Sequence, residues 1–277
     1  MGKIVGAFGM PHIMFSPDGV EEQAGAVLDG MTQVRRRIAA LAPDRLVLIG
    51  SDHFNNFHLG LQIPLAIGVS DRFRTLGDGG VPVFEFPGDR IFAEGLARYA
   101  AKADFELVQA EEIAPDHGMA FPRLVADPAN AIPTILLYVN SGMPLPPSSR
   151  RCYSLGTVLR AFIEAARPAD ERVVVIGLGD LPHWLRMTGE GRIAEQFDLG
   201  FLEILETGRA RAFAQDHSSD DIPAAAGNGG LEVLSWLVVA AAVEGSNGQR
   251  ISFEPVGAWI TGMAAIEFAT MAIPGAG

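Results

Sequence analysis

Three of the six histidines in this 277-residue chain come after segments whose composition predicts buried β-strands. His12 follows the first apolar run, His53 follows the second, and His183 lies beyond the run that ends near Ile176. In open α/β sheets the ligand crevice lies outside the carboxyl ends of the strands. We therefore expect these three imidazoles to meet at one edge of the sheet.

A carboxylate would complete a metal site with two of these imidazoles. Two histidines and one carboxylate form the facial triad of non-haem Fe(II) oxygenases, which leaves coordination positions open for substrate and dioxygen. Glu232 is the candidate, since the segment Gly227–Glu232 places an acid in the first turn of an apolar helix. An acid there also stabilises the helix dipole, so a purely structural role for Glu232 stays open.

His117, in the segment Pro115–Gly118, lies in a predicted loop before an apolar segment. The adjacent Asp116 is expected to be either an exposed acid, the commoner case, or a carboxylate that biases the tautomer of His117. His58 and His217 lie in less suggestive surroundings.

The elements that must position these residues alternate between strands and helices, which is typical of an α/β domain with helices on both faces of a sheet. No segment resembles a linker, so we expect a single domain over residues 1–277. Strands are expected at 3–8, 45–49, 61–69, 105–108, 132–139, 172–176 and 251–260, and helices at 20–41, 90–102, 151–166, 191–208 and 230–243.

Composition excludes several classes of function. The 33 acidic against 21 basic residues give a formal charge of -12, which disfavours binding to nucleic acid or to anionic lipid. The apolar runs are shorter than the roughly 18 residues of a membrane span. The chain has no P-loop, no nucleophile elbow and no complete dinucleotide fingerprint.

A single cysteine, Cys152, permits neither an intrachain disulfide nor a thiolate zinc site, which predicts a cytoplasmic protein. Residues 1–15 imitate a signal peptide, with Lys3 before an apolar run, but they contain Pro11 and lack a small-residue cleavage site. We interpret this segment as the first strand.

Five motifs stand in order along the chain: Met10–His12, Ser51–Phe57, Pro115–Gly118, the Gly-rich turn ending in His183, and Gly230–Glu232 followed by Trp236. Together they resemble the class III extradiol ring-cleavage dioxygenases, and the similarity covers most of the chain. The segment around Asn140 and Arg150 resembles the 2,3-dihydroxyphenylpropionate dioxygenase branch, and the family also includes the protocatechuate 4,5-dioxygenase catalytic subunit.

The resemblance implies a three-layer α/β/α fold with a mixed sheet and an enzyme that opens catechol-type rings with O₂. It implies Fe(II) bound by His12, His53 and Glu232, with His117 and His183 as the catalytic pair, and it favours a homo-oligomer. The identity of the substrate stays open, because candidate catechols differ in the ring substituents that the pocket walls contact. Two other classes stay open as well: a zinc hydrolase on the same ligand set, and a metal-free scaffold relative.

The chain departs from the family pattern at two positions. The family has Gly, a small residue, Ser and His where this chain has Asp180–His183, so Pro182 decides how His183 is oriented. His58 replaces an aromatic residue and is either a surface histidine or a pocket residue. Within the second motif, Asp52 and Asn55 are expected to hold the turn by hydrogen bonds to nearby backbone.

Overall fold

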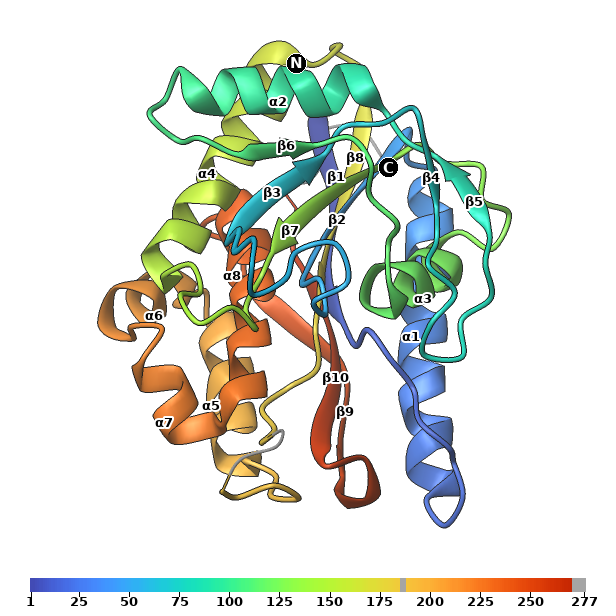
Figure 1. The fold of residues 1–277 in the computed structure, drawn as a ribbon, viewed down its shortest axis with the longest axis vertical. Helices are drawn as coiled ribbons and strands as arrows, with labels where there is room; N and C mark the ends of the chain where they lie inside the picture. Colours follow the sequence, from blue (N-terminus) through green and yellow to red (C-terminus); the bar gives the residue numbers. More distant parts are fainter. Residues whose placement is uncertain (185–187, 271–277) are drawn as a thin grey trace.

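The computed structural model describes residues 1–184 and 188–270. Its centre is a mixed sheet of eight strands in the order β6-β3-β7-β2-β8-β1-β10-β9, and β4 and β5 form a small separate sheet (Figure 1). The strands are β1 (Lys3–Met10), β2 (Arg45–Gly50), β3 (Leu65–Gly68), β4 (Arg72–Arg74), β5 (Glu85–Pro87), β6 (Val108–Ala110), β7 (Thr134–Val139), β8 (Arg172–Leu178), β9 (Gly248–Val256) and β10 (Thr261–Phe268).

Helices cover both faces of the sheet, as predicted for a three-layer α/β/α fold (Figure 1). They are α1 (Glu21–Leu41), α2 (Arg90–Ala101), α3 (His117–Ala126), α4 (Ser149–Ala166), α5 (Glu195–Glu206), α6 (Ala210–Asp216), α7 (Asp221–Ala226) and α8 (Val233–Ala242), with 3-10 helices η1 (Asn228–Glu232) and η2 (Gly257–Trp259). Along the described chain, no helix combines the length and apolarity needed to cross a bilayer.

Alternate side chains of one strand pack into the two different layers. Leu46 and Leu48 of β2 belong to the core cluster formed with α1 and α3. Val47 and Ile49 belong to the cluster formed with α2, α4 and α8. This is the period-2 alternation of a strand buried on both faces, and it explains why β2, β7 and β8 are near-continuous apolar runs.

The centre of the sheet is parallel and its edges are not. Strands β7, β2, β8 and β1 run parallel, whereas β3 is antiparallel to β7 and β10 is antiparallel to both β1 and β9. The carboxyl ends of the four central strands therefore lie at one edge of the sheet, where the loops with the candidate residues begin.

Several predicted boundaries were wrong. The strand predicted at 61–69 is only four residues long, and the strand predicted at 105–108 begins at Val108. The chain predicted as one strand at 251–260 ends β9 at Val256 and then returns as β10, which we did not predict. Tertiary pairing decides these three changes, because the extent of a strand depends on the neighbours with which it pairs as well as on its own apolar pattern.

Candidate metal centre

The sheet order explains why three distant histidines lie together. Strands β2, β8 and β1 are neighbours, and His53, His183 and His12 follow their carboxyl ends. The ring centroids of His12 and His53 are 4.9 Å apart. The parallel crossover topology thus brings the turns that carry them to one edge of the sheet, as the positions of the histidines after strand ends predicted. His12 and His53 are in ring contact, and His183 lies close enough to act electrostatically on His12.

Glu232 lies between two of these imidazoles. Its Oε2 is 3.2 Å from His12 Nδ1, and its Oε1 is 3.8 Å from His53 Nε2. Glu232 is the last residue of η1, directly before α8, and only 8% of it is exposed. The backbone N–H of Asp180 donates a 2.7 Å hydrogen bond to Glu232 Oε2 and holds the carboxylate in this position.

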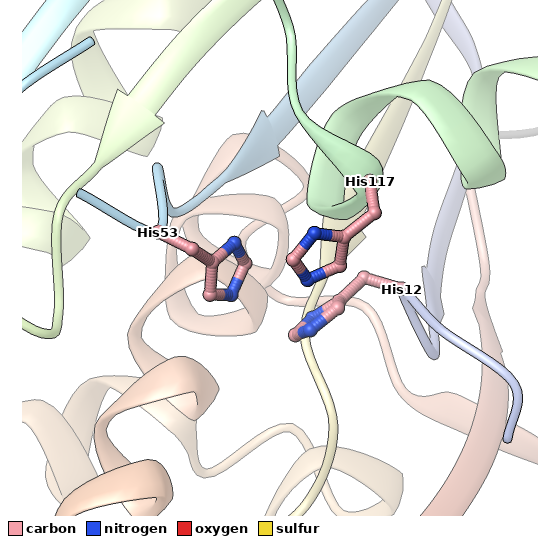
Figure 2. A group of neighbouring side chains, drawn as sticks. All are labelled: His12, His53 and His117. Atoms are coloured by element: carbon pink, nitrogen blue, oxygen red, sulfur yellow. The ribbon is translucent and has the colours of Figure 1, made fainter. Parts of the chain in front are cut away.

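His117 is the third member of a compact group of imidazoles. His12, His53 and His117 each offer a ring nitrogen, and these atoms lie within 4.8 Å of one another (Figure 2). The rings of His53 and His117 are stacked with centroids 4.5 Å apart. His117 is the first residue of α3, not a loop residue as predicted.

The partner of His117 is a residue that our sequence analysis missed. Asp78 Oδ2 lies 2.5 Å from His117 Nδ1, and Asp78 Oδ1 accepts a hydrogen bond from the His117 backbone N–H. The segment Gly77–Gly80 indicates a turn, but a turn does not show which distant side chain it contacts.

Asp116 is neither the exposed acid nor the partner of His117 that we expected. It is fully buried, and its Oδ2 lies 3.1 Å from Nδ1 of His53, not of His117. The same oxygen accepts hydrogen bonds from the His53 backbone N–H and from Asn55 Nδ2, while Oδ1 caps α3 through Gly118 N–H. Folding of the loop after β2 onto the start of α3 decides this contact.

Burial and charge separate the protonation states of the group. Burial lowers the pKa of His12 to about 4, although Glu232 acts in the opposite direction. Burial would also lower the pKa of His53, but hydrogen bonds to Asp116 and Glu232 outweigh it and raise that pKa to about 10. Burial opposes ionisation of Glu232, yet the surrounding imidazoles hold its pKa below the usual range.

His183 lies buried next to η1. Its Nδ1 is 2.8 Å from the carbonyl oxygen of Leu181, and its own carbonyl accepts a hydrogen bond from Gly229 N–H. The outer edge of the ring occupies the space where a Cβ on Gly229 would stand. The Asp180–His183 turn therefore keeps the imidazole inside the protein, packed against a glycine that admits it.

The turn after β2 is held by Asp52, as we expected, but the Asn55 side chain bonds to the distant carboxylate of Asp116 instead of to nearby backbone. The Asp52 carboxylate accepts hydrogen bonds from the backbone N–H groups of Asn55, Asn56 and Phe57, and from Asn56 Nδ2. Asn55 links the turn to Asp116. These contacts fix the segment that carries His53.

The two remaining histidines take no part in the group. His58 is exposed, and its Nδ1 accepts a hydrogen bond from Gly60 N–H. His217 stacks on Phe213, with ring centroids 4.2 Å apart. The structure therefore favours the surface interpretation of His58.

A mixed α/β/α sheet with histidines and acids at the carboxyl edge of its parallel strands defines a metal-site-bearing α/β protein. A sequence model described as the catalytic LigB subunit of aromatic ring-opening dioxygenase matches residues 6–264. The chain therefore belongs to this family, which confirms the resemblance seen in the motifs. Members of the family are ring-cleaving dioxygenases and depend on a metal.

Named relatives agree with this assignment. The chain is 25% identical over 304 aligned positions to 2,3-dihydroxyphenylpropionate/2,3-dihydroxicinnamic acid 1,2-dioxygenase of Escherichia coli O81 (strain ED1a), covering 91% of this chain and 95% of the relative. The Escherichia coli K12 protein of the same name matches with the same identity and coverage. The crystal structure of the uncharacterized protein JW3007 from Escherichia coli K12 shares the fold, with a TM-score of 0.59, 19% identity and coverage of 86% of this chain and 92% of that one.

Proposed function

We propose that the protein is a non-haem Fe(II)-dependent extradiol dioxygenase that cleaves the aromatic ring of a catecholic, carboxylated substrate with O₂. The observation that carries the proposal is the position of Glu232 between His12 and His53. We assign these three side chains as the iron ligands and His117 and His183 as the catalytic pair, within one catalytic domain over residues 1–277.

The donor set fits Fe(II). One buried carboxylate with a low pKa and a neutral His12 supply two ligands without a change of protonation. His53 carries a proton in the metal-free chain, because two carboxylates flank it. A cation suits that position, since metal binding displaces protons from its ligands.

When bound, Fe(II) would favour a chelating catecholate and lower the pKa of its hydroxyl groups. Side chains of the protein would then accept and donate the protons of the reaction. The carbonyl of Leu181 can only accept a hydrogen bond, so His183 holds its proton on Nδ1 and leaves Nε2, on the ring edge that packs against Gly229, unprotonated. A neutral imidazole with an unprotonated Nε2 can act as the general base toward a substrate hydroxyl that reaches this edge.

His117 would handle a second proton. Asp78 accepts from its Nδ1, so Nε2 is left unprotonated and can accept a hydrogen bond from a substrate hydroxyl; once it has taken up that proton, it can deliver it to an oxygen atom later in the reaction. The burial of His12, His183 and Glu232 limits the access of water that would compete for these protons.

The test is anaerobic loading of the purified chain with Fe(II) or Zn(II), followed by an oxygen-electrode assay on a panel of catechols. We expect O₂ uptake with ring-opened product only in the Fe(II)-loaded protein. His217→Ala, a histidine variant outside the site, serves as the matched control and should retain full activity. Hydrolysis by the Zn(II) form without O₂ uptake would instead establish the hydrolase alternative, and metal binding without turnover would support a scaffold.

We also infer that the enzyme works in the cytoplasm as a homo-oligomer. The only cysteine, Cys152, is buried and unpaired, and several large apolar side chains are exposed, among them Ile91 (77%) and Leu145 (78%). Surfaces of this kind are often covered by a second copy. Light scattering after size exclusion should give a mass of at least twice 29.5 kDa, and a monomer mass would contradict the inference.

A further inference from the structure

The loop between β4 and β5 delivers a carboxylate to the imidazole group from a separate small sheet. Asp78, in this loop, makes two contacts with one residue: Oδ2 lies 2.5 Å from His117 Nδ1, and Oδ1 lies 2.8 Å from His117 N. One carboxylate thus grips both the ring and the backbone of His117. Two contacts from one rigid group fix the ring's direction better than one contact would.

The loop that carries Asp78 is itself anchored. The backbone carbonyl of Asp78 accepts a hydrogen bond from Val81 N–H. Leu76 N–H donates a hydrogen bond to the carbonyl of Pro115, just before α3. Thr75 Oγ1 accepts a hydrogen bond from Phe84 N–H across the hairpin. The loop is therefore tied at its base and along the chain that leads to His117.

The loop also lies directly on the catalytic histidine. Gly79 has φ of +57°, and a Cβ at this position would stand 2.7 Å from the Cβ of His117. A side chain there would push the loop off α3, so a glycine is required by both the backbone conformation and the close approach. Asp78 and His117 are only partly exposed, at 29% and 17% of their side chains.

Two carboxylates divide the start of α3 between two histidines. Asp116 contacts Nδ1 of His53 and caps Gly118 N–H, whereas Asp78 contacts Nδ1 of His117 and its backbone N–H. The positive end of the helix dipole stabilises both anions. Each carboxylate contacts a Nδ1 atom. The edge of each ring that carries Nε2 is therefore left for the centre of the group, where the rings lie next to one another (Figure 2).

We propose that Asp78 is the positioning residue that holds His117 in the Nδ1–H tautomer and aims its Nε2 at the reacting atoms. A carboxylate only accepts hydrogen bonds, so it selects the tautomer with the proton on Nδ1. The consequence for turnover rests on the proposed function, whereas the tautomer of His117 does not.

A double-mutant cycle with variants of Asp78 and His117 tests whether Asp78 acts on turnover through His117. Asp78→Asn keeps the size and one acceptor oxygen but cannot accept at both nitrogens, and its amide group can donate to Nδ1 and invert the tautomer. We expect kcat to fall roughly 10- to 100-fold, the range for partners that orient functional histidines, with KM and iron content nearly unchanged. Asp78→Glu should recover part of the loss, and Asp71→Asn, an exposed acid on the same hairpin, should have no effect.

In a His117→Gln background, Asp78→Asn should cause no further loss, because the partner through which Asp78 acts has been removed. A full additional loss in that background would overturn the proposal, as would wild-type kcat in Asp78→Asn alone.

The second measurement needs neither metal nor substrate. ¹⁵N NMR of the imidazole nitrogens in the metal-free protein, assigned by comparison with His117→Gln, reports the tautomer of His117 directly. We expect Nδ1–H in the wild type and an altered ratio in Asp78→Asn. Identical spectra would overturn the proposal even if activity falls. An altered tautomer in a protein without dioxygenase activity would instead refute the proposed function and leave the positioning role standing.

Discussion

The four histidines of the site differ most in what contacts their Nδ1 atoms. Nδ1 of His12 faces Glu232, that of His53 faces Asp116, that of His117 faces Asp78, and that of His183 faces a backbone carbonyl. A partner of this kind sets the tautomer and the basicity of the opposite nitrogen. Four identical side chains at one edge of the sheet can therefore take different roles.

At this scale we expect Glu232→Ala to lose iron. Removing one of three protein ligands should weaken binding by well over tenfold, and it leaves His12 and His53 without the carboxylate that contacts both. Chelator competition with the purified variant measures the change. Exposed Glu112→Gln is the control, and full iron occupancy in Glu232→Ala would remove this residue from the ligand set.

The catalytic pair should separate by pH. His183→Ala should keep its iron and bind catechol but lose roughly 10² to 10⁴ in kcat, the span of general acid and base groups. Because the missing step is deprotonation, this loss should shrink as pH rises and the substrate ionises unaided. The loss in His117→Ala should not recover in the same way. Identical pH profiles of kcat for the two variants would refute the assignment of His183 as the base.

At the scale of elements, the site depends on turns that follow strands rather than on the strands themselves. The turn after β2 is organised around the carboxylate of Asp52, which gathers the N–H groups of three successive residues. The buried Asp52 has a raised pKa because of its desolvation. Such a turn is stable only as long as its acceptor is present, since buried N–H groups without partners are costly.

We therefore expect Asp52→Ala to lower the free energy of unfolding by about 2–3 kcal/mol, since several buried donors lose their acceptor together. Asn55→Ala, which removes one side-chain contact to Asp116, should cost about 1 kcal/mol. Urea denaturation of both variants and of the wild type provides the comparison. An unchanged midpoint in Asp52→Ala with abolished turnover would show that its role is chemical rather than structural.

At the scale of the whole molecule, one buried acid stands apart from the site. Asp198 of α5 is fully buried, and within the described chain neither of its carboxylate oxygens has a hydrogen-bond partner. Its Oδ2 occupies the space beside Gly262 of β10, where a Cβ would collide with it. Burial, with a smaller effect of Glu195, raises the pKa of Asp198 to about 8.

The raised pKa predicts how stability changes with pH. The unfolded chain releases this proton near its ordinary value of 3.8, while the folded chain keeps it up to about pH 8. The contribution to stability is therefore complete below the unfolded pKa and is lost as pH rises through the folded one.

Asp198→Asn lacks this dependence. One pKa unit corresponds to about 1.4 kcal/mol, and about 1 kcal/mol shifts Tm by roughly 2–4 °C in a domain of this size. The Tm of Asp198→Asn relative to wild type should therefore rise by at least about 3 °C between pH 5 and pH 8.5 in calorimetry. A constant difference across that range would contradict the raised pKa.

The sequence by itself determined the layered α/β class, the central strands and the family, because buried parallel strands are continuous apolar runs and because the motifs stand at strand ends. It also singled out His12, His53, His117, His183 and Glu232, whose residue types limit the chemistry they can do. These are local signals, and local patterns survive without knowledge of the fold.

Only the tertiary structure decided the partners. Asp78 lies 39 positions from His117, and Asp116 lies 63 positions from His53. The pairing of β9 with β10 and the start of α3 at His117 were likewise hidden from the sequence. A hydrogen bond between distant side chains depends on how loops from different strands pack together, and that packing has no periodicity to reveal it.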